Sequence, residues 1–162
     1  MNKQDWAYVA GFFDGEGYIG LAKNKRKYRD NTDNCYWSLN IMISNTDIRV
    51  IKHLQNLLGG FTSLKTIPAS PKGKLHKPQH NFYTLTIKKK EHRLAFIKGI
   101  LPYAIIKKDQ LILALAYIAY MEKNGHIGGR RLTQEEFVIR NDFYLKFRNL
   151  KGFYPNESEG DE

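Results

Sequence analysis

Residues 6–21 read WAYVAGFFDGEGYIGL, a stretch that fits the first helix of the protein yet contains two locally unfavourable features. Small residues recur every four positions (Ala7, Gly11 and Gly15), although glycine inside a helix costs about 0.5–1 kcal/mol relative to alanine. Two acids, Asp14 and Glu16, follow at the carboxyl end, where the helix dipole disfavours an anion by about 0.3–1 kcal/mol. Because such departures from local preference concentrate at functional sites, the stretch indicates a functional helix end.

The composition indicates a globular protein that binds a polyanion. Hydrophobic residues make up 42% of the 162-residue chain, enough for one domain with a core. The net charge is +10, although the last eight residues, PNESEGDE, carry four acids and no base. This balance favours nucleic acid as the partner over an anionic membrane surface, since the basic residues are not gathered on an amphipathic helix.

Several classes of protein are excluded by what the sequence lacks. No apolar run is long enough to span a bilayer, and the N-terminus has no secretory signal, so we expect an intracellular protein without a membrane partner. The single cysteine, Cys35, excludes an intrachain disulfide and a multi-cysteine zinc site. We interpret Cys35 as a small apolar residue in a strand.

The clearest strand is residues 35–45, CYWSLNIMISN, in which apolar and polar residues alternate. One face carries Trp37, Leu39, Ile41 and Ile43, and the other carries Tyr36, Ser38, Asn40, Met42 and Ser44. Such alternation is typical of a half-buried antiparallel strand. We expect residues 18–23 to form its hairpin partner, across the basic segment 23–29 and a turn at 30–34.

Apolar periodicity and capping residues predict the other elements. We expect helices at 5–14, 47–58, 91–101, 108–123 and 133–150, and a second strand pair at 61–67 and 81–88. Asp5 is the expected N-cap of the first helix, and Thr133 with Glu136 forms a capping box for the last. The order αββαββα plus two helices predicts an α+β fold with a curved antiparallel sheet under helices. Residues 1–150 would form one domain, and residues 151–162 a disordered acidic tail.

The polar face of this sheet is predicted to bind double-stranded DNA, because basic segments at 23–29, 65–77 and 88–90 border it and a two-stranded ribbon fits the major groove. The candidate DNA-binding residues are Lys23, Lys25, Arg26, Lys27, Tyr28, Arg29, Ser38, Asn40, Lys65, Lys72, Lys74, Lys77 and Thr84. Most lysines on loops would contact phosphates, which gives salt-sensitive affinity without sequence specificity.

Residues 9–17, VAGFFDGEG, resemble the motif that names the LAGLIDADG homing endonucleases. The positions identical to that name are Ala10, Gly11, Asp14 and Gly17. Gly15 replaces a small residue, and Glu16 replaces an acid one methylene shorter. The predicted αββαββα order over residues 5–101 is also that of the family core. The resemblance implies an intron- or intein-encoded enzyme that cuts long, partly symmetric DNA sites and leaves short 3′ overhangs.

The motif occurs once in this chain, and single-motif members of the family act as homodimers. The resemblance therefore implies a homodimer that reads a pseudo-palindromic site. Motif helices of the family pack against each other at the dimer centre, where small residues let two backbones approach closely. The residues expected in this interface are Ala7, Ala10, Gly11 and Gly15.

The resemblance also implies the catalytic residues. Glu16 would bind Mg²⁺, with Mn²⁺ or Ca²⁺ able to substitute, and the Gly15 carbonyl would add a second oxygen. Lys107, in LPYAIIKK (residues 101–108), and Arg49, in ISNTDIR (residues 43–49), would act beside the metal. Lys108 is the alternative to Lys107, and either Arg49 or Lys107 could be a solvated surface cation. Asn45 would line the site or cap the second helix, and Asp14 would brace the motif.

Two other functions are compatible with the same fold. An RNA maturase that assists intron splicing would have intron RNA as its partner, and it need not retain Glu16. A catalytically inactive DNA-binding regulator is the other alternative. An acid at position 16 and a lysine at position 107 favour the nuclease over both.

Overall fold

The computed structural model describes residues 1–27, 33–69, 80–124 and 132–151, in which helices cover one face of an antiparallel sheet with strand order β1-β2-β4-β3. The strands are β1 (Gly17–Lys27), β2 (Asp33–Asn45), β3 (Ser63–Ile67) and β4 (Phe82–Thr86). The helices are α1 (Lys3–Glu16), α2 (Ile48–Leu58), α3 (Lys90–Ile100), α4 (Lys108–Lys123) and α5 (Gln134–Asn149). The predicted α+β class and the αββαββα order with two further helices are confirmed.

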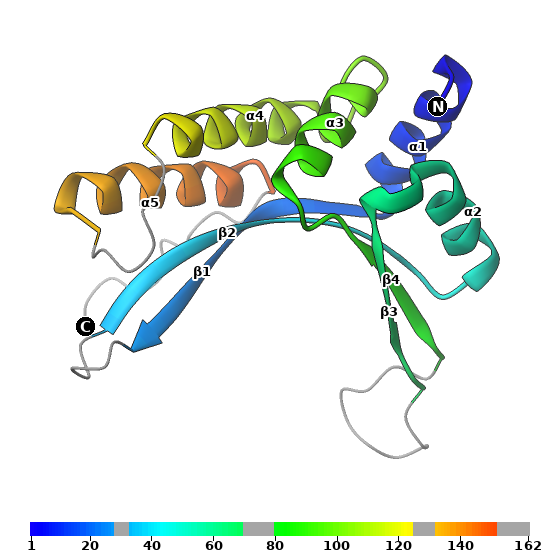
Figure 1. Ribbon diagram of the computed structural model, residues 1–162, viewed down its shortest axis with the longest axis horizontal. Coiled ribbons are helices and arrows are strands. Elements are labelled where there is room, and N and C mark those ends of the chain that lie inside the picture. The colour runs from blue at the N-terminus through cyan, green and yellow to red at the C-terminus, as the bar shows by residue number, and fades with distance from the viewer. Residues whose placement is uncertain (28–32, 70–79, 125–131, 152–162) are drawn as a thin grey trace, which may run out of the picture.

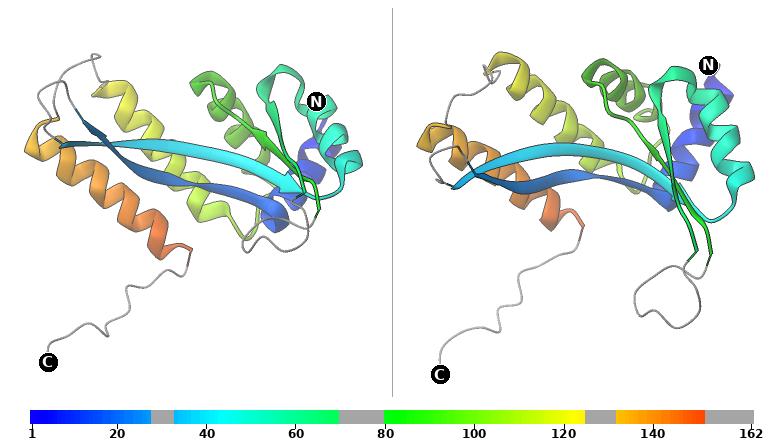
Figure 2. Two further views of the ribbon diagram at one scale, coloured as in Figure 1. Left: turned by 90° about the horizontal axis from the view of Figure 1, so that it is seen from below. Right: turned by 60° about the horizontal axis from the view of Figure 1, so that its bottom comes forward.

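The sheet forms an arch with the helices above it and a concave face below (Figure 1). β1 and β2 pair along their whole length, from Gly17 opposite Ile43 to Lys27 opposite Asp33. β2 pairs with β4 only over Met42–Asn45, so the β1–β2 ribbon and the β3–β4 hairpin diverge from a short shared centre. Figure 2 shows the two ribbons from below, with α5 beside β1.

The core lies between the sheet and the helices, as the alternation in residues 35–45 predicts. The buried apolar residues of the strands, with Ile87 directly after β4, are all at most 6% exposed: Ile19, Leu21, Trp37, Leu39, Ile41, Ile43, Leu85 and Ile87. Phe13 of α1 meets Phe96 of α3 edge to face, with ring centroids 5.2 Å apart. Burial of these apolar surfaces, worth about 25 cal/mol per Å², supplies most of the driving force for the fold.

α1 begins at Lys3, earlier than the predicted start at Asp5. Asn2 is the N-cap and accepts a hydrogen bond from the Asp5 N–H (2.8 Å), while the Asp5 carboxylate accepts from the Asn2 N–H (3.1 Å). Asp5 is thus the third helical residue of a capping box, which satisfies two N–H groups rather than one. The predicted capping box of Thr133 and Glu136 on α5 is confirmed.

β1 is longer than the predicted strand at 18–23 and continues to Lys27, because each of its residues finds a partner in β2. The cations at 23–27 therefore lie on a strand, and their alternation decides which face of the sheet each side chain takes. Among the helices of the described residues, none is both long and apolar enough to cross a membrane.

Gly99 of α3 offers a direct test of the packing between α3 and α1. A β-carbon at Gly99 would lie 2.5–2.6 Å from three atoms of the Trp6 ring, so we expect Gly99→Ala to lower the free energy of unfolding by about 1–3 kcal/mol in urea titrations. Gly60→Ala is the control, because a β-carbon there meets no atom within 4 Å. Equal stabilities for the two variants would contradict the packing described here.

Candidate active site and nucleic-acid interface

α1 ends on an exposed carboxylate directly beside the sheet. Glu16 is the last residue of the helix, and β1 starts at Gly17 without an intervening loop. The Gly17 N–H donates to the Phe13 carbonyl, and a side chain at Gly17 would collide with the Phe13 ring. Glycine at this position therefore allows the chain to leave the helix and enter the strand within one residue.

The other acid of the motif, Asp14, is 9% exposed and forms hydrogen bonds with a distant part of the chain. Its carboxylate accepts hydrogen bonds from three consecutive backbone N–H groups, those of Ile105 (2.6 Å), Ile106 (3.2 Å) and Lys107 (3.0 Å). These donors offset the cost of an anion at the negative end of the α1 dipole. The predicted bracing role of Asp14 thus has a specific structural form.

Lys107 extends its ammonium back to the same helix end. Its Nζ donates to the Asp14 carbonyl and lies 5.9 Å from the centre of the Phe13 ring. Burial lowers the pKa of Lys107, while the negative charges of Asp14 and Glu16 oppose that shift. The structure thus brings the predicted pair Glu16 and Lys107 to one end of α1, whereas the alternative, Lys108, is exposed at the start of α4.

Arg49 and Asn45 are both engaged in the start of α2. Arg49 pairs with Asp47 (2.6 Å), its side chain is 88% exposed, and the pair lowers the Asp47 pKa to about 2. Asn45 accepts a hydrogen bond from the Asp47 N–H (2.8 Å), so its side chain shapes the turn before the helix. Asn45 lies at the end of β2 beyond Ile43, the partner of Gly17, and so at the same end of the ribbon as Glu16. Their catalytic roles stay predictions.

Three of the four residues predicted for a helix–helix interface lie on the surface of α1. Ala7, Gly11 and Gly15 are exposed, and a β-carbon at Gly11 or Gly15 would meet no atom within 4 Å. Ala10 is fully buried in the core, three residues before Phe13 on the inward side of the helix. The inclusion of Ala10 is therefore corrected, because its side chain already packs inside its own protomer.

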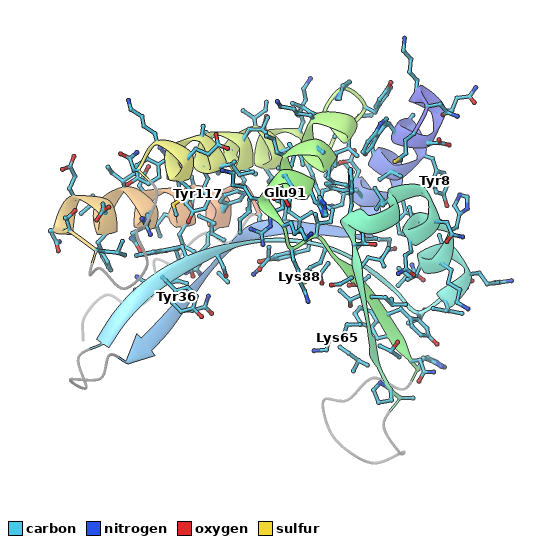
Figure 3. All side chains as sticks on the ribbon, viewed as in Figure 1. Tyr8, Tyr36, Lys65, Lys88, Glu91 and Tyr117 are labelled. Atoms are coloured by element: carbon cyan, nitrogen blue, oxygen red, sulfur yellow. The ribbon has the colours of Figure 1, made fainter. Side chains whose placement is uncertain are left out.

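The concave face carries polar and basic side chains from several strands. Figure 3 shows Tyr36, Lys65 and Lys88 below the arch, on the side away from the helices. Ser38 lies on the same face as Tyr36 by strand alternation and accepts a hydrogen bond from Asn24 Nδ2 (3.2 Å). Asn40 lies opposite Gly20 and is half-buried.

Three candidate DNA-binding residues are positioned differently from the prediction. Lys23 lies opposite Trp37 on the helix-facing side, where its Nζ donates to Asn141 of α5 (3.0 Å) and stands over the Trp37 ring. Lys25 takes the same side by alternation. Thr84 is 8% exposed, and its hydroxyl shares a hydrogen bond with Ser44 (2.9 Å), so it braces β2 against β4.

Several other candidates cannot be compared with the structure. Arg26 and Lys27 lie in β1, but their side chains are outside the described residues. The candidates that lie wholly outside the described residues are Tyr28, Arg29, Lys72, Lys74 and Lys77. Their contacts with DNA stay predictions.

Lys151, which the prediction assigned to the acidic tail, packs on the sheet. Its Nζ stands 3.7 Å from the centre of the Tyr18 ring, and its side chain occupies the space that a side chain at Gly20 would need. Because Tyr18 and Gly20 face away from the buried Ile19, Lys151 places a cation on the concave face. Only the missing side chain at Gly20 hints at this contact in the sequence.

The protomer holds no closed metal site in the part of the chain that the structure describes, since no three His, Cys, Asp or Glu side chains gather there. Glu16 is the exposed carboxylate of the motif, and no hydrogen bond or ion pair engages it among those residues. Asp14 points its carboxylate at backbone N–H groups instead. The two acids, two residues apart, therefore have opposite environments.

Solved structures share this architecture at low sequence identity. The homing endonuclease I-CvuI, in complex with the I-CreI target, has a TM-score of 0.63 and 14% identity, covering 98% of this chain and 89% of that one. The archaeal intron-encoded homing endonuclease I-Vdi141I, complexed with DNA, has a TM-score of 0.62 and 14% identity, with the same coverage. The LAGLIDADG meganuclease I-AabMI, bound to uncleaved DNA, has a TM-score of 0.62 and 18% identity, covering 96% of this chain but 50% of that one.

At the level of sequence, no curated protein matches this chain. A family model does match, and it is the model of the LAGLIDADG endonucleases, aligned to residues 9–120. The matched region starts at Val9, the first residue of the motif, and runs through the sheet, the Asp14-bound loop and most of α4. Since it spans more than half of the sequence, the chain belongs to the LAGLIDADG endonuclease family.

Proposed function

We propose that this protein is a site-specific homing endonuclease that, as a homodimer, makes a metal-dependent double-strand break with short 3′ overhangs in a long pseudo-palindromic DNA site. The observation that carries the proposal is the end of α1, where an exposed Glu16 and the ammonium of Lys107 lie together beside the concave face. Solved structures of this fold include complexes with DNA, and those of I-CvuI were obtained in the presence of magnesium or calcium.

The chemistry of Glu16 fits a divalent cation that a protomer does not enclose by itself. Mg²⁺ usually binds one or two carboxylates and completes its shell with waters and substrate phosphates. Glu16, with the neighbouring Gly15 carbonyl, would hold such an ion where DNA approaches. When bound, the ion polarises phosphate oxygens and lowers the pKa of water. The second carboxylate would come from a second protomer.

Lys107 would stabilise the negative charge that develops on the phosphate during hydrolysis. Its ammonium is held by the Asp14 carbonyl and is partly shielded from solvent, and such a preorganised cation acts more strongly than one in bulk water. Arg49 is exposed at the start of α2, and it would order the surrounding water or contact the DNA backbone once DNA binds.

DNA would lie along the concave face. Lys65, Lys88 and Lys151 supply cations there, whereas Lys23 is held against α5 on the opposite side. Polar side chains on the strands, such as Ser38 and Asn40, would read base edges in the major groove. Affinity would fall steeply with salt, because the cations release counterions from the phosphates.

The surface of α1 supports a homodimer. Glycines at 11 and 15 each cost helix stability, yet a β-carbon at either position would meet nothing within the protomer. Ile105 and Ile106, whose N–H groups bind Asp14 next to Gly15 in the chain, are 83% and 75% exposed. A second copy placed against this surface would explain the glycines and cover the two isoleucines.

Replacing Glu16 with Gln tests the catalytic assignment. The amide has the same size but no charge, so we expect Glu16→Gln to abolish cleavage while DNA affinity changes only a few-fold. The wild-type target would first be selected from plasmids with long randomised inserts plus Mg²⁺, followed by sequencing of cleaved ends, with EDTA as the metal-free control. Cleavage and binding by the variant are then measured on that target.

The control variant is Glu91→Gln, an exposed acid at the start of α3, which should cut like the wild type. Cleavage by Glu16→Gln at the wild-type rate would refute the assignment of Glu16. If the wild-type protein cuts nothing but binds structured RNA or DNA tightly, the maturase or the regulator replaces the nuclease as the function.

Replacing Gly11 with Leu tests the homodimer. Leucine is the better helix former by roughly 0.8 kcal/mol and has open space in the protomer, so the fold should be no less stable. Dimerisation, measured by analytical ultracentrifugation, should weaken by at least tenfold. Lys52→Leu, at an exposed position of α2, is the control and should leave dimerisation unchanged. A Gly11→Leu protein that dimerises like the wild type would exclude α1 as the interface.

A further inference from the structure

The loop that follows α3 has no regular structure between Leu101 and Lys107, yet three of its N–H groups converge on one side chain. Ile105 and Ile106 share one oxygen of the Asp14 carboxylate, and Lys107 donates to the other oxygen. An ionised carboxylate has about four lone-pair positions and can accept all three bonds. An amide or a hydroxyl could not accept the same set.

Apolar packing does not hold this part of the loop. Ala104 is 5% exposed and marks the last residue anchored in the core, but the next two side chains project into solvent. Lys107 lies directly before α4, which begins at Lys108. Between the core contact at Ala104 and the start of α4, the hydrogen bonds to Asp14 therefore hold the backbone N–H groups, while the Lys107 carbonyl accepts from the Leu111 N–H of α4 (2.9 Å).

The same residue also receives the side chain of Lys107. The backbone N–H of Lys107 is bound by the Asp14 carboxylate, and its Nζ is bound by the Asp14 main-chain carbonyl. Both ends of the lysine are thus attached to one residue of α1, two positions before Glu16. A lysine side chain otherwise loses much of its rotamer freedom when it is fixed in place, and these two attachments hold it.

We propose that Asp14 is a positioning residue for catalysis: it fastens the loop at residues 105–107 to α1 and so delivers the ammonium of Lys107 to Glu16. This inference rests on the proposed nuclease function for its catalytic consequence, and on the geometry alone for the attachment. In this role Asp14 acts through Lys107, because its carboxylate is already bound by backbone N–H groups.

The variant Asp14→Asn tests the catalytic consequence. The amide keeps the size of the side chain but cannot accept all three bonds, so the loop is released. We expect the single-turnover cleavage rate to fall by about 10²-fold, the scale of an ångström-level misplacement, while DNA affinity stays within a few-fold. Lys107→Met in the Asp14→Asn background should add little further loss, because the two changes remove the same contribution. If the loss of cleavage rate in the double variant equals the product of the losses in the two single variants, the proposal is overturned.

Asp5→Asn is the matched control, since it weakens the capping box at the other end of α1 without touching the loop. It should reduce stability slightly and leave the cleavage rate unchanged. An equal loss of cleavage in Asp5→Asn and Asp14→Asn would show a general effect of helix stability and contradict positioning.

A second readout does not need nuclease activity. Lys107 and its exposed neighbour Lys108 can be compared within one sample by acylation with an amine-reactive ester and mass spectrometry. We expect the ratio of Lys107 to Lys108 reactivity to approach one in Asp14→Asn, because release of the loop exposes the Lys107 ammonium to solvent. A ratio that is the same in the wild type and in Asp14→Asn would overturn the attachment itself.

Amide hydrogen exchange of the wild type covers the case in which Asp14→Asn does not fold. The N–H groups of Ile105, Ile106 and Lys107 should exchange slowly although two of the side chains are exposed. Exchange at the rate of an open loop would overturn the proposal. If the wild type cuts no DNA but shows this protection, the proposed function fails and the attachment by Asp14 stands.

Discussion

The carboxylate of Asp14 is the contact on which the arrangement of the candidate site depends. It joins α1 to a loop about 91 positions later in the chain, through N–H bonds from Ile105, Ile106 and Lys107. Placed alone at the negative end of a helix dipole, this anion would be destabilising. The three donors and the Lys107 ammonium reverse that balance, and the buried anion becomes the point where the loop, the helix and the lysine meet.

The neighbouring acid is unfavourable in the same way but lacks this compensation. Glu16 sits at the last position of α1, exposed, and no described group donates to its carboxylate. One of the two acids is therefore satisfied inside the protomer and the other is left for a partner outside it. This difference distinguishes the candidate catalytic acid from the structural one more clearly than the sequence does, because the sequence shows only two acids in the same motif.

Much of the fold was predictable because it follows from short-range patterns. The alternation from Trp37 to Ile43 predicted which face of β2 is buried. The capping box of Thr133 and Glu136 predicted where α5 begins. Contacts between residues far apart in the chain were not predictable from the sequence. The Lys23 ammonium donates a hydrogen bond to Asn141 of α5. The Lys151 side chain packs over Gly20 and places its ammonium on the Tyr18 ring on the concave face. The small-residue pattern likewise did not separate Ala10, which is buried, from Ala7, Gly11 and Gly15, which are exposed.

The glycines of α1 give the strongest reason to look beyond a single protomer. Each costs the helix about 0.5–1 kcal/mol relative to alanine. A β-carbon at Gly11 or Gly15 would meet no atom within 4 Å. Gly17 and Gly99, by contrast, are required by Phe13 and Trp6 of the same protomer. The helix stability lost at Gly11 and Gly15 is therefore not explained by any contact within the protomer. Close approach of a second α1, which needs small residues, would explain it. The same approach would bring a second Glu16 toward the first, which is what the cleavage of two DNA strands requires.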